Sequence, residues 1–279
     1  MRVNGSQLVM EILLQHGVDT AFGYPGGAAL NIYDALYEYS DRIKVVTAAH
    51  EQGASHAADG YARATGKTGV CFATSGPGAT NLVTGIATAF MDSIPLVAIT
   101  ANVPDSLIGR DAFQEVSISN IVIPVTKNTY FINRIDDLED ALYNAFRIAN
   151  SGRKGPVLVD ITKDVTAAMT NFKPRKPMPL NPLPTFSKAD LKKVADMINA
   201  SSKPVIYCGG GVAASEAGPE LLQLMDKAGI PAAHTLMSAG VIGYDHPKNL
   251  GMVGMHGTIA ANKAFDRADL MIAPRHPFQ

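Results

Sequence analysis

The chain has 279 residues, of which 47% are hydrophobic and 18% charged, and its formal net charge is -1, so the length predicts two domains. The near-neutral charge, without a Lys/Arg run on any predicted helix, argues against nucleic acid or an anionic membrane as a partner. No apolar run approaches the roughly 20 residues that span a bilayer, and the N-terminus lacks the apolar stretch of a signal peptide. The two cysteines, Cys71 and Cys208, are expected to be buried free thiols of a soluble, cytoplasmic protein.

Short β-branched runs alternate with segments of helical period through residues 1–165. Apolar side chains recur with a helical period at residues 8–13 and again at 138–146, which predicts helices there. The predicted strands lie at 44–47, 69–74, 95–100 and 156–160. Because these runs are apolar throughout rather than alternating, they suit a parallel sheet that is covered on both faces. Strands that alternate with helices predict an α/β fold with a doubly wound parallel sheet.

The composition changes after this first unit. Five prolines lie between Pro174 and Pro184, which excludes a helix or an inner strand and indicates an extended linker. Beyond it we expect a helix that Ser187 caps, with Asp190 three residues on, then strands and helices up to residue 273. The predicted organisation is a first domain at residues 1–170, a Pro-rich linker at 171–188 and an incomplete second α/β, Rossmann-like domain at 189–279.

Three glycine-rich turns stand where predicted strands meet helices, which is the edge at which open α/β sheets bind ligands. They are Gly23–Ala28, Thr74–Asn81 and Gly209–Val212. None contains the Gly-Lys-Ser/Thr of a phosphate loop or the Gly-x-Gly-x-x-Gly of a dinucleotide site, which argues against an unrelated nucleotide-binding dehydrogenase. Taken alone, each turn is better explained by tight-turn geometry than by a ligand cradle.

The segment His50–Gly66 is rich in small residues and predicts a closely packed helix. It follows the strand that ends at Thr47, so its first turn places Glu51 at the ligand edge of the sheet. A carboxylate among apolar neighbours there can share a proton with a ligand nitrogen. The alternative is that Glu51 only interacts with the helix dipole. His50 and His56 lie on different helix faces without a third ligand, so no metal site is predicted.

In their order and detail these motifs resemble the large catalytic subunit of acetolactate synthase (acetohydroxyacid synthase), a thiamine-diphosphate enzyme of isoleucine and valine biosynthesis. The resemblance covers nearly the whole chain up to about residue 273, in the stretches Phe22–Ala28, His50–Gly66, Thr74–Asn81, Asp92–Thr100, Gly109–Glu115, Gly152–Asp164 and Gly251–Asn262. Gly109–Glu115 favours the biosynthetic synthase over decarboxylases and oxidases of the superfamily. The family is a group of transferases that condense two pyruvates, or pyruvate and 2-ketobutyrate, with loss of CO2, and its cofactors are thiamine diphosphate, Mg²⁺ and FAD.

The resemblance implies a role for each matching residue. Glu51 corresponds to the glutamate that hydrogen-bonds N1′ of the aminopyrimidine and so helps to activate the thiazolium C2. The other residues near the reacting centre are Gly27, Ala28, Gln114 and Lys163. The residues that face a cofactor are Pro77, Asn81 and Phe113 in the first domain and, for FAD, Arg153, Gly209, Gly210, Gly211, Met255, His256, Gly257 and Thr258. Ala101-Asn102 departs from the Gly-Gln that is usual in the family.

The family also has a third domain, which holds the diphosphate and Mg²⁺ through a Gly-Asp-Gly motif that ends in an Asn pair, and this sequence contains neither. We therefore expect a fragment that is inactive alone. The alternatives are a non-catalytic remnant or another thiamine-diphosphate carboligase or decarboxylase. Residues 274–279 depart from the family pattern, and a one-base frameshift is our hypothesis for them. A homodimer or tetramer and a small regulatory subunit are the protein partners that the resemblance implies.

Overall fold

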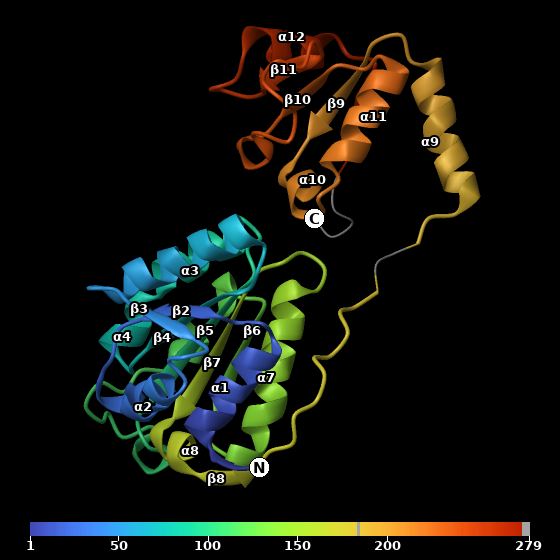
Figure 1. Ribbon diagram of the computed structural model, residues 1–279. Coiled ribbons are helices and arrows are strands. Elements are labelled where there is room, and N and C mark those ends of the chain that lie inside the picture. The colour runs from blue at the N-terminus through green and yellow to red at the C-terminus, as the bar shows by residue number, and fades with distance from the viewer. Residues whose placement is uncertain (183–184, 275–279) are drawn as a thin grey trace. The chain divides into compact units, whose positions relative to one another are not determined.

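The computed structural model describes residues 1–182 and 185–274. The chain divides into two compact units, the first at Met1–Asn181 and the second from Pro182 onward, and Figure 1 shows a sheet with packed helices in each. Within the described residues, no helix has both the length and the apolar character needed to cross a membrane. The frameshift hypothesis concerns residues 274–279, and of these 275–279 lie outside the described part of the chain.

The first unit is built on a six-stranded parallel sheet in the order β3-β2-β4-β5-β7-β6. Its strands are β2 (Thr20–Gly23), β3 (Lys44–Thr47), β4 (Gly69–Ala73), β5 (Leu96–Asn102), β6 (Asn128–Ile132) and β7 (Pro156–Thr162). Two short strands, β1 (Arg2–Asn4) and β8 (Met169–Asn171), pair antiparallel apart from this sheet. The inner strands β4, β5 and β7 are buried along their whole length. Of the edge strands, β3 is largely exposed and β6 is mostly half-buried. The predicted doubly wound parallel sheet is confirmed.

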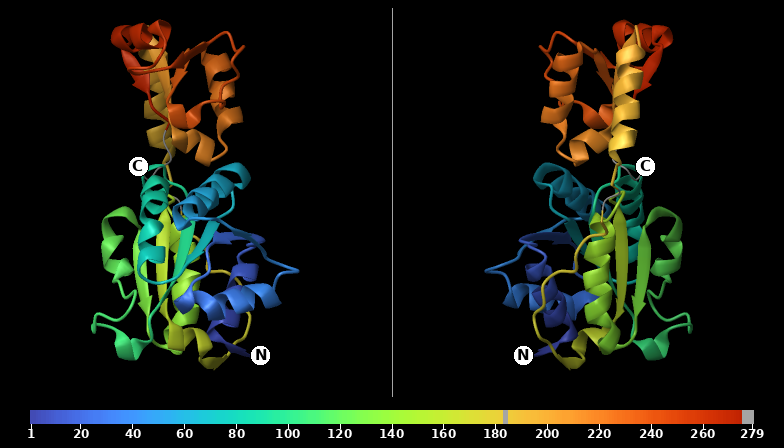
Figure 2. Two further views of the ribbon diagram at one scale, coloured as in Figure 1. Left: turned by 90° about the vertical axis from the view of Figure 1, so that its left-hand side faces the viewer. Right: turned by 90° about the vertical axis from the view of Figure 1, so that its right-hand side faces the viewer.

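Helices cover both faces of this sheet, as the views in Figures 1 and 2 show. One face carries α1 (Gly5–Gln15), α2 (Leu30–Glu38), α7 (Ile135–Asn150) and α8 (Lys163–Ala167). The other carries α3 (Glu51–Thr65), α4 (Pro77–Asn81), α5 (Val83–Met91) and α6 (Ile118–Ile121). Short 3₁₀ turns complete the unit at η1 (Gly27–Ala29), η2 (Asp105–Leu107) and η3 (Ile123–Val125). Successive residues such as Cys71 and Phe72 belong to opposite layers because side chains alternate along a strand.

Local sequence explains where α1 and α3 begin and where α3 ends. Asn4 caps α1, since its side chain accepts from Gln7 N at 2.8 Å while the Gln7 side chain accepts from Asn4 N at 3.1 Å. His50 caps α3, because its Nδ1 accepts from Gln52 N at 3.1 Å. The same helix ends at Gly66, whose φ of 72° is the left-handed conformation that glycine adopts without a Cβ clash.

The first part of the Pro-rich segment lies against the first unit. Phe172 is 2% exposed and packs in the core below α1 and α7. The Arg175 guanidinium stacks 4.2 Å from the Tyr143 ring centroid, and the Tyr143 hydroxyl donates to Arg175 O at 3.1 Å. Asn181 N donates to Ser151 Oγ at 3.3 Å. The division after Asn181 therefore falls inside the predicted linker, at a point where the chain leaves its contacts with the first unit.

The second unit contains a four-stranded parallel sheet in the order β11-β10-β9-β12. Its strands are β9 (Pro204–Cys208), β10 (Ala232–His234), β11 (Asn249–Met252) and β12 (Leu270–Ile272). Its helices are α9 (Lys188–Ala200), α10 (Gly210–Ala214), α11 (Gly218–Ala228) and α12 (Ile259–Arg267), with η4 at Leu236–Ser238. The predicted capping of α9 is confirmed, because the Ser187 and Asp190 side chains each accept from the other's backbone N–H. Cys208 in β9 and Cys71 in β4 are buried free thiols, as predicted.

Candidate functional site at the carboxyl ends of β2, β3 and β4

The strand order of the first sheet reverses at β2, because β3 lies on one side of it and β4 on the other. In open α/β sheets ligands bind outside the carboxyl ends of the strands at such a switch point. Here β2 leads into the turn at 24–26, β3 leads into the start of α3, and β4 leads into the turn at 74–76. The two glycine-rich turns of the first unit and Glu51 therefore meet at one edge, which we call the switch crevice.

Glu51 is the first residue of α3 and is 9% exposed. Asn81 Nδ2 donates to Glu51 Oε2 at 2.9 Å, which fixes the orientation of the carboxylate. The other oxygen, Oε1, lies beside Gly78, where an added Cβ would come within 3.2 Å of it and within 2.7 Å of Thr74 Cγ2. Glycine at position 78 therefore lets the start of α4 pack closely against Thr74 and Glu51 Oε1, because a side chain there would crowd both.

The turn after β2 is held closely against the turn after β4. Ala28 N donates to the Thr74 hydroxyl at 3.2 Å, and a Cβ added at Gly26 would lie 2.4 Å from Thr74 Cγ2. A Cβ added at Gly27, in contrast, would meet no atom within 4 Å. Lys163, the first residue of α8, donates from Nζ to Gly27 O at 3.1 Å. Gly27, Ala28 and Lys163 thus come together with open space above the Gly27 backbone.

The predicted substrate residues Phe113 and Gln114 lie on the segment that follows β5. A Cβ added at Gly76 would lie 2.6 Å from Gln114 O and 2.9 Å from Gln114 Cα, so the two backbones are in close contact. This contact places Gln114 next to Pro77, the first residue of α4. The Phe113 side chain is 86% exposed. Five predicted site residues of this unit therefore share the crevice, namely Glu51, Gly27, Pro77, Asn81 and Lys163. The segment that carries Gln114 lies beside them.

Tyr33 is a residue at this edge that the sequence did not single out. Its hydroxyl is buried and has no hydrogen-bond partner within the described part of the chain. It would lie 2.4 Å from a Cβ added at Gly23. Burial raises the pKa of Tyr33, and the nearby Cys71 thiol and Glu51 carboxylate raise it further. The available signal was Gly23 itself, because a glycine that ends a strand often marks the close approach of another group.

Asp160 is a second buried polar residue that the sequence did not single out. It is 1% exposed in β7, and its carboxylate accepts from Thr100 Oγ1 at 2.6 Å and from Asn102 Nδ2 at 2.7 Å. Burial raises the pKa of Asp160 to about 6, and the two hydrogen bonds counteract part of this effect. Asn102 Nδ2 also lies 3.3 Å from Val116 O, so the cluster ties the segment that carries Gln114 to the sheet.

Arg153 lies away from the switch crevice. Its Nε donates to Ser93 Oγ at 2.8 Å and its Nη2 donates to Met91 O at 3.1 Å. Ser93 precedes β5 and Arg153 precedes β7, so both lie at the amino ends of the strands, opposite Glu51. In this structure Arg153 donates to carbonyl groups at the end of α5, a contact that no sequence pattern predicted.

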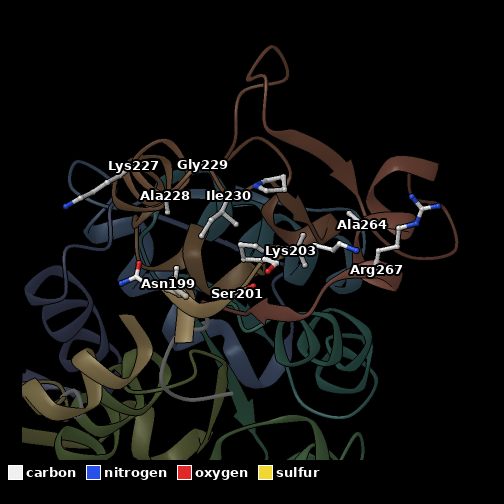
Figure 3. A pocket seen from close by; sticks show the side chains of 14 residues that line it. Asn199, Ser201, Lys203, Lys227, Ala228, Gly229, Ile230, Ala264 and Arg267 are labelled. Carbon is white, nitrogen blue, oxygen red and sulfur yellow. The ribbon is translucent and has the colours of Figure 1, made fainter. Parts of the chain in front are cut away.

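The predicted residues of the second unit lie at the carboxyl edge of its own sheet. Gly209–Gly211 follow β9, where the strand order reverses between β9 and β12, and Met255–Thr258 follow β11. Thr258 caps α12, because its Oγ1 accepts from Ala261 N at 3.0 Å. A hollow of about 740 Å³ lies at the opposite edge, lined by residues 198, 199, 201–205 and 227–231 with Ala264 and Arg267 (Figure 3). The hollow is therefore separate from Gly209–Gly211 and from Met255–Thr258. In residues 1–182 and 185–274, no three His, Cys, Asp or Glu side chains are grouped to hold a metal ion.

Two family models match the chain. Residues 3–121 match the thiamine pyrophosphate enzyme N-terminal TPP binding domain, and residues 191–273 match the thiamine pyrophosphate enzyme central domain.

Whole-chain similarity extends to named relatives. The chain is 50% identical over 275 residues to an acetolactate synthase large subunit of Mycobacterium tuberculosis, which covers 98% of this chain and 44% of the relative. It is 47% identical over 271 residues to the acetolactate synthase isozyme 2 large subunit of Escherichia coli, covering 97% and 49%. It is 47% identical over 278 residues to a probable acetolactate synthase large subunit of Methanocaldococcus jannaschii, covering 97% and 46%. The chain thus spans about half the length of the curated relatives that it matches.

Proposed function

This chain belongs to the thiamine pyrophosphate enzyme family, and on that basis we propose that it forms the pyrimidine-binding and central domains of an acetolactate synthase large subunit. In this proposal the first unit supplies the aminopyrimidine side of a thiamine-diphosphate site. The substrates are pyruvate and a second 2-keto acid, either pyruvate or 2-ketobutyrate, which condense with loss of CO2. The relatives' names and the identity along nearly the whole chain support this choice over other reactions of the family.

The observation that carries the proposal is the position of Glu51 at the switch crevice. When bound, thiamine diphosphate supplies a carbon nucleophile that adds to the keto carbon of the substrate. A carboxyl group in hydrogen-bond contact with a pyrimidine nitrogen can hold a proton between the two. Asn81 donates to one Glu51 oxygen, and Gly78, which has no side chain, lies beside the other. The chain's residues therefore suit the aminopyrimidine, with Glu51 as the proton-holding group and Pro77 as part of the wall.

The same crevice offers groups for the keto acid. The Lys163 ammonium group lies at Gly27 O and brings a positive charge to the open space above Gly27. A substrate carboxylate is attracted to such a charge. Gln114 adds an amide side chain from the neighbouring segment, and the exposed Phe113 ring adds an apolar surface. We assign these three residues to substrate binding and Gly27 to the backbone that lines the reacting centre.

We assign FAD to the second unit. Gly209–Gly211 and Met255–Thr258 both lie at the carboxyl edge of its sheet, where nucleotides bind in related folds. We assign Mg²⁺ and the diphosphate to a part of the enzyme beyond the two matched family models. A homodimer or tetramer with a small regulatory subunit, in the cytoplasm, completes the proposal, and the two free thiols suit a reducing compartment.

The test is a complementation assay. A full-length relative whose glutamate corresponding to Glu51 is changed to glutamine is mixed with this chain, thiamine diphosphate, Mg²⁺ and FAD, and acetolactate from pyruvate is measured. If active sites form between two subunits, the chain restores product, and Glu51→Gln lowers the restored rate by about 10²-fold or more. Glu38→Gln is the matched control, because Glu38 is exposed and contacts only the Gln7 side chain among hydrogen-bond donors of the described residues.

Two outcomes contradict the proposal. Equal product with the Glu51→Gln chain would remove Glu51 from the reaction. The second outcome is that neither the unchanged chain nor Glu38→Gln restores product, although mass spectrometry detects a mixed dimer with the relative. The first unit would then not supply the aminopyrimidine side of an active site. The chain assayed without the relative, under the same conditions, shows whether it turns over alone.

A further inference from the structure

The segment Gly109–Glu115 has an unusual backbone. Gly109, Asp111 and Gln114 have φ angles of 76°, 53° and 59°, all in the left-handed region. Glycine adopts this conformation readily, but Asp111 and Gln114 carry a Cβ that crowds the backbone there. Strained residues of this kind persist only where the surrounding structure fixes them. The contacts that fix this segment therefore decide where the Phe113 and Gln114 side chains point.

One side chain provides those contacts. Glu115 Oε1 accepts from Gly109 N at 2.5 Å, and Oε2 accepts from Ala112 N at 3.0 Å and from Arg110 N at 3.3 Å. Glu115 N itself donates to Ala112 O at 2.9 Å, so the segment closes on itself. These backbone donors hold the pKa of Glu115 below its usual value.

The two ends of the longer segment are anchored separately. At its start, Asp105 N donates to Asp164 Oδ1 at 2.9 Å, and at its end the Asn102 side chain reaches Val116 O at 3.3 Å. Between these anchors, the Gln114 backbone packs against Gly76 of the switch crevice. The anchors tie the base of the segment to the sheet, whereas the Glu115 carboxylate shapes the part that reaches the crevice.

We propose that Glu115 is a positioning residue that holds Phe113 and Gln114 at the switch crevice, in the orientation in which they meet the keto acid. Glu115 acts through the backbone of Gly109–Ala112 and does not itself touch the substrate. The identity of the ligand rests on the proposed function, but the positioning rests on the contacts above. Because the carboxylate accepts three N–H groups, no neutral side chain of the same length replaces it. An amide keeps one acceptor oxygen and turns an NH₂ group toward backbone donors.

The experiment compares Glu115→Gln with Asp111→Asn in the full chain. Asp111→Asn is the matched control, because it removes an exposed carboxylate from the same segment and asparagine tolerates the left-handed conformation. Amide hydrogen exchange and amide NMR signals are recorded for both. In Glu115→Gln we expect Gly109 and Ala112 to exchange about ten-fold faster or more, and the Gly76 and Gly78 signals to shift across the contact with Gln114. Exchange in β4 and β5 stays unchanged, and the control matches the unchanged chain throughout.

Reaction kinetics supply the second readout. In the complementation assay, Glu115→Gln is expected to raise KM for pyruvate about ten-fold with a smaller change in kcat, because orientation of the substrate groups is lost while Glu51 is untouched. Unchanged exchange at Gly109 and Ala112, or loosening of β4 and β5 in step with them, overturns the proposal. Loosened exchange with unchanged KM in an active mixture also overturns it. If the unchanged chain yields no product, the proposed function fails, while exchange and the Gly76 signal still decide whether Glu115 positions this segment.

Discussion

At the scale of single residues, Asp160 shows how burial and hydrogen bonding compete. Its carboxylate accepts from Thr100 and Asn102, which favours the charged form, yet burial dominates and raises the pKa to about 6. The pKa of the same group in the unfolded chain is near 3.9. The protonated form is therefore favoured by folding, and the stability that it contributes is complete below about pH 4 and is lost as the pH rises through about 6.

This predicts a pH-dependent difference between the chain and an Asp160→Asn variant. The shift of about two pKa units corresponds to roughly 3 kcal/mol at about 1.4 kcal/mol per unit. The free energy of unfolding of the unchanged chain, measured relative to the variant, should fall by about 2–3 kcal/mol between pH 4 and pH 7, because the variant does not titrate. Urea unfolding at pH 4, 5.5 and 7 measures it. A difference that stays flat over this range would contradict the raised pKa.

At the scale of elements, the turns of the crevice place opposite demands on neighbouring glycines. A Cβ at Gly26 would lie 2.5 Å from Thr74 Cβ, an atom close to the backbone that cannot rotate away. Thr74 would have to move, and its hydroxyl would lose the N–H of Ala28. A Cβ at Gly27 meets open space. The first glycine is thus required for packing, whereas the second leaves room for a ligand.

Alanine at these two positions should therefore separate stability from binding. Gly26→Ala is expected to lower the free energy of unfolding by about 1–3 kcal/mol, because it overpacks the contact between the turns. Gly27→Ala should leave it within about 0.5 kcal/mol and instead weaken the complementing activity with thiamine diphosphate. Urea unfolding of both variants, with the assay above, checks the pair. Equal destabilisation by the two substitutions would show that the space above Gly27 is occupied by the chain itself.

Sequence patterns predicted some elements of the first unit and not others. The apolar runs that predicted β4, β5 and β7 were clear because those strands are buried on both faces. The strand β3 was also predicted, although it is exposed. β2 and β6 were missed, because β2 is four residues long and ends in glycine, and the β6 residues Asn128–Ile132 follow no pattern of burial. The backbone conformation of Gly109–Glu115 could not be predicted from the sequence either, because it depends on the Glu115 carboxylate, which accepts from backbone N–H groups of its own segment.

The candidate site was predictable to a similar degree. The motifs and the alternation of strands with helices together predicted that Glu51 and the glycine-rich turns containing Gly27 and Asn81 lie at the ligand edge, because parallel strands present their carboxyl ends on the same side. The hydrogen bond between Asn81 and Glu51 required coordinates, because the two residues are 30 positions apart in the sequence. Tyr33 and Asp160 were missed for the same reason. Each looks ordinary in sequence. Only the structure shows that the Tyr33 hydroxyl is buried and that Asp160, which ends the predicted strand 156–160, accepts from Thr100 and Asn102.

At the scale of the whole molecule, the first unit extends past its last strand. Phe172 is buried among α1, α7 and the sheet, and its backbone N–H donates to Met1 O at 2.8 Å. The Met1 amino group in turn donates to Phe172 O at 2.6 Å. Arg175 and Asn181 continue these contacts along the surface of the unit. A domain cut at the end of β8 would lose them.

Fragments of different length should therefore differ sharply in stability. Residues 1–181 are expected to fold alone with the free energy of unfolding that the first unit shows in the full chain. Residues 1–171 should be less stable by about 3–5 kcal/mol, as for loss of a buried phenylalanine side chain. Residues 1–187 serve as the control and should match 1–181. Calorimetry measures all three, and a fragment 1–171 as stable as 1–181 would show that residues 172–181 contribute nothing to stability.

Each unit carries one cysteine on an inner strand, Cys71 in β4 and Cys208 in β9, and both are shielded from solvent. Burial raises the pKa of Cys71 to about 12 and also raises that of Cys208. Only the thiolate reacts with alkylating reagents, so neither residue reacts at neutral pH while its strand is closed. The two cysteines are therefore native probes of the opening of each unit. The rate at which iodoacetamide modifies each thiol reports how often that unit opens, separately for the two units and without any engineered label.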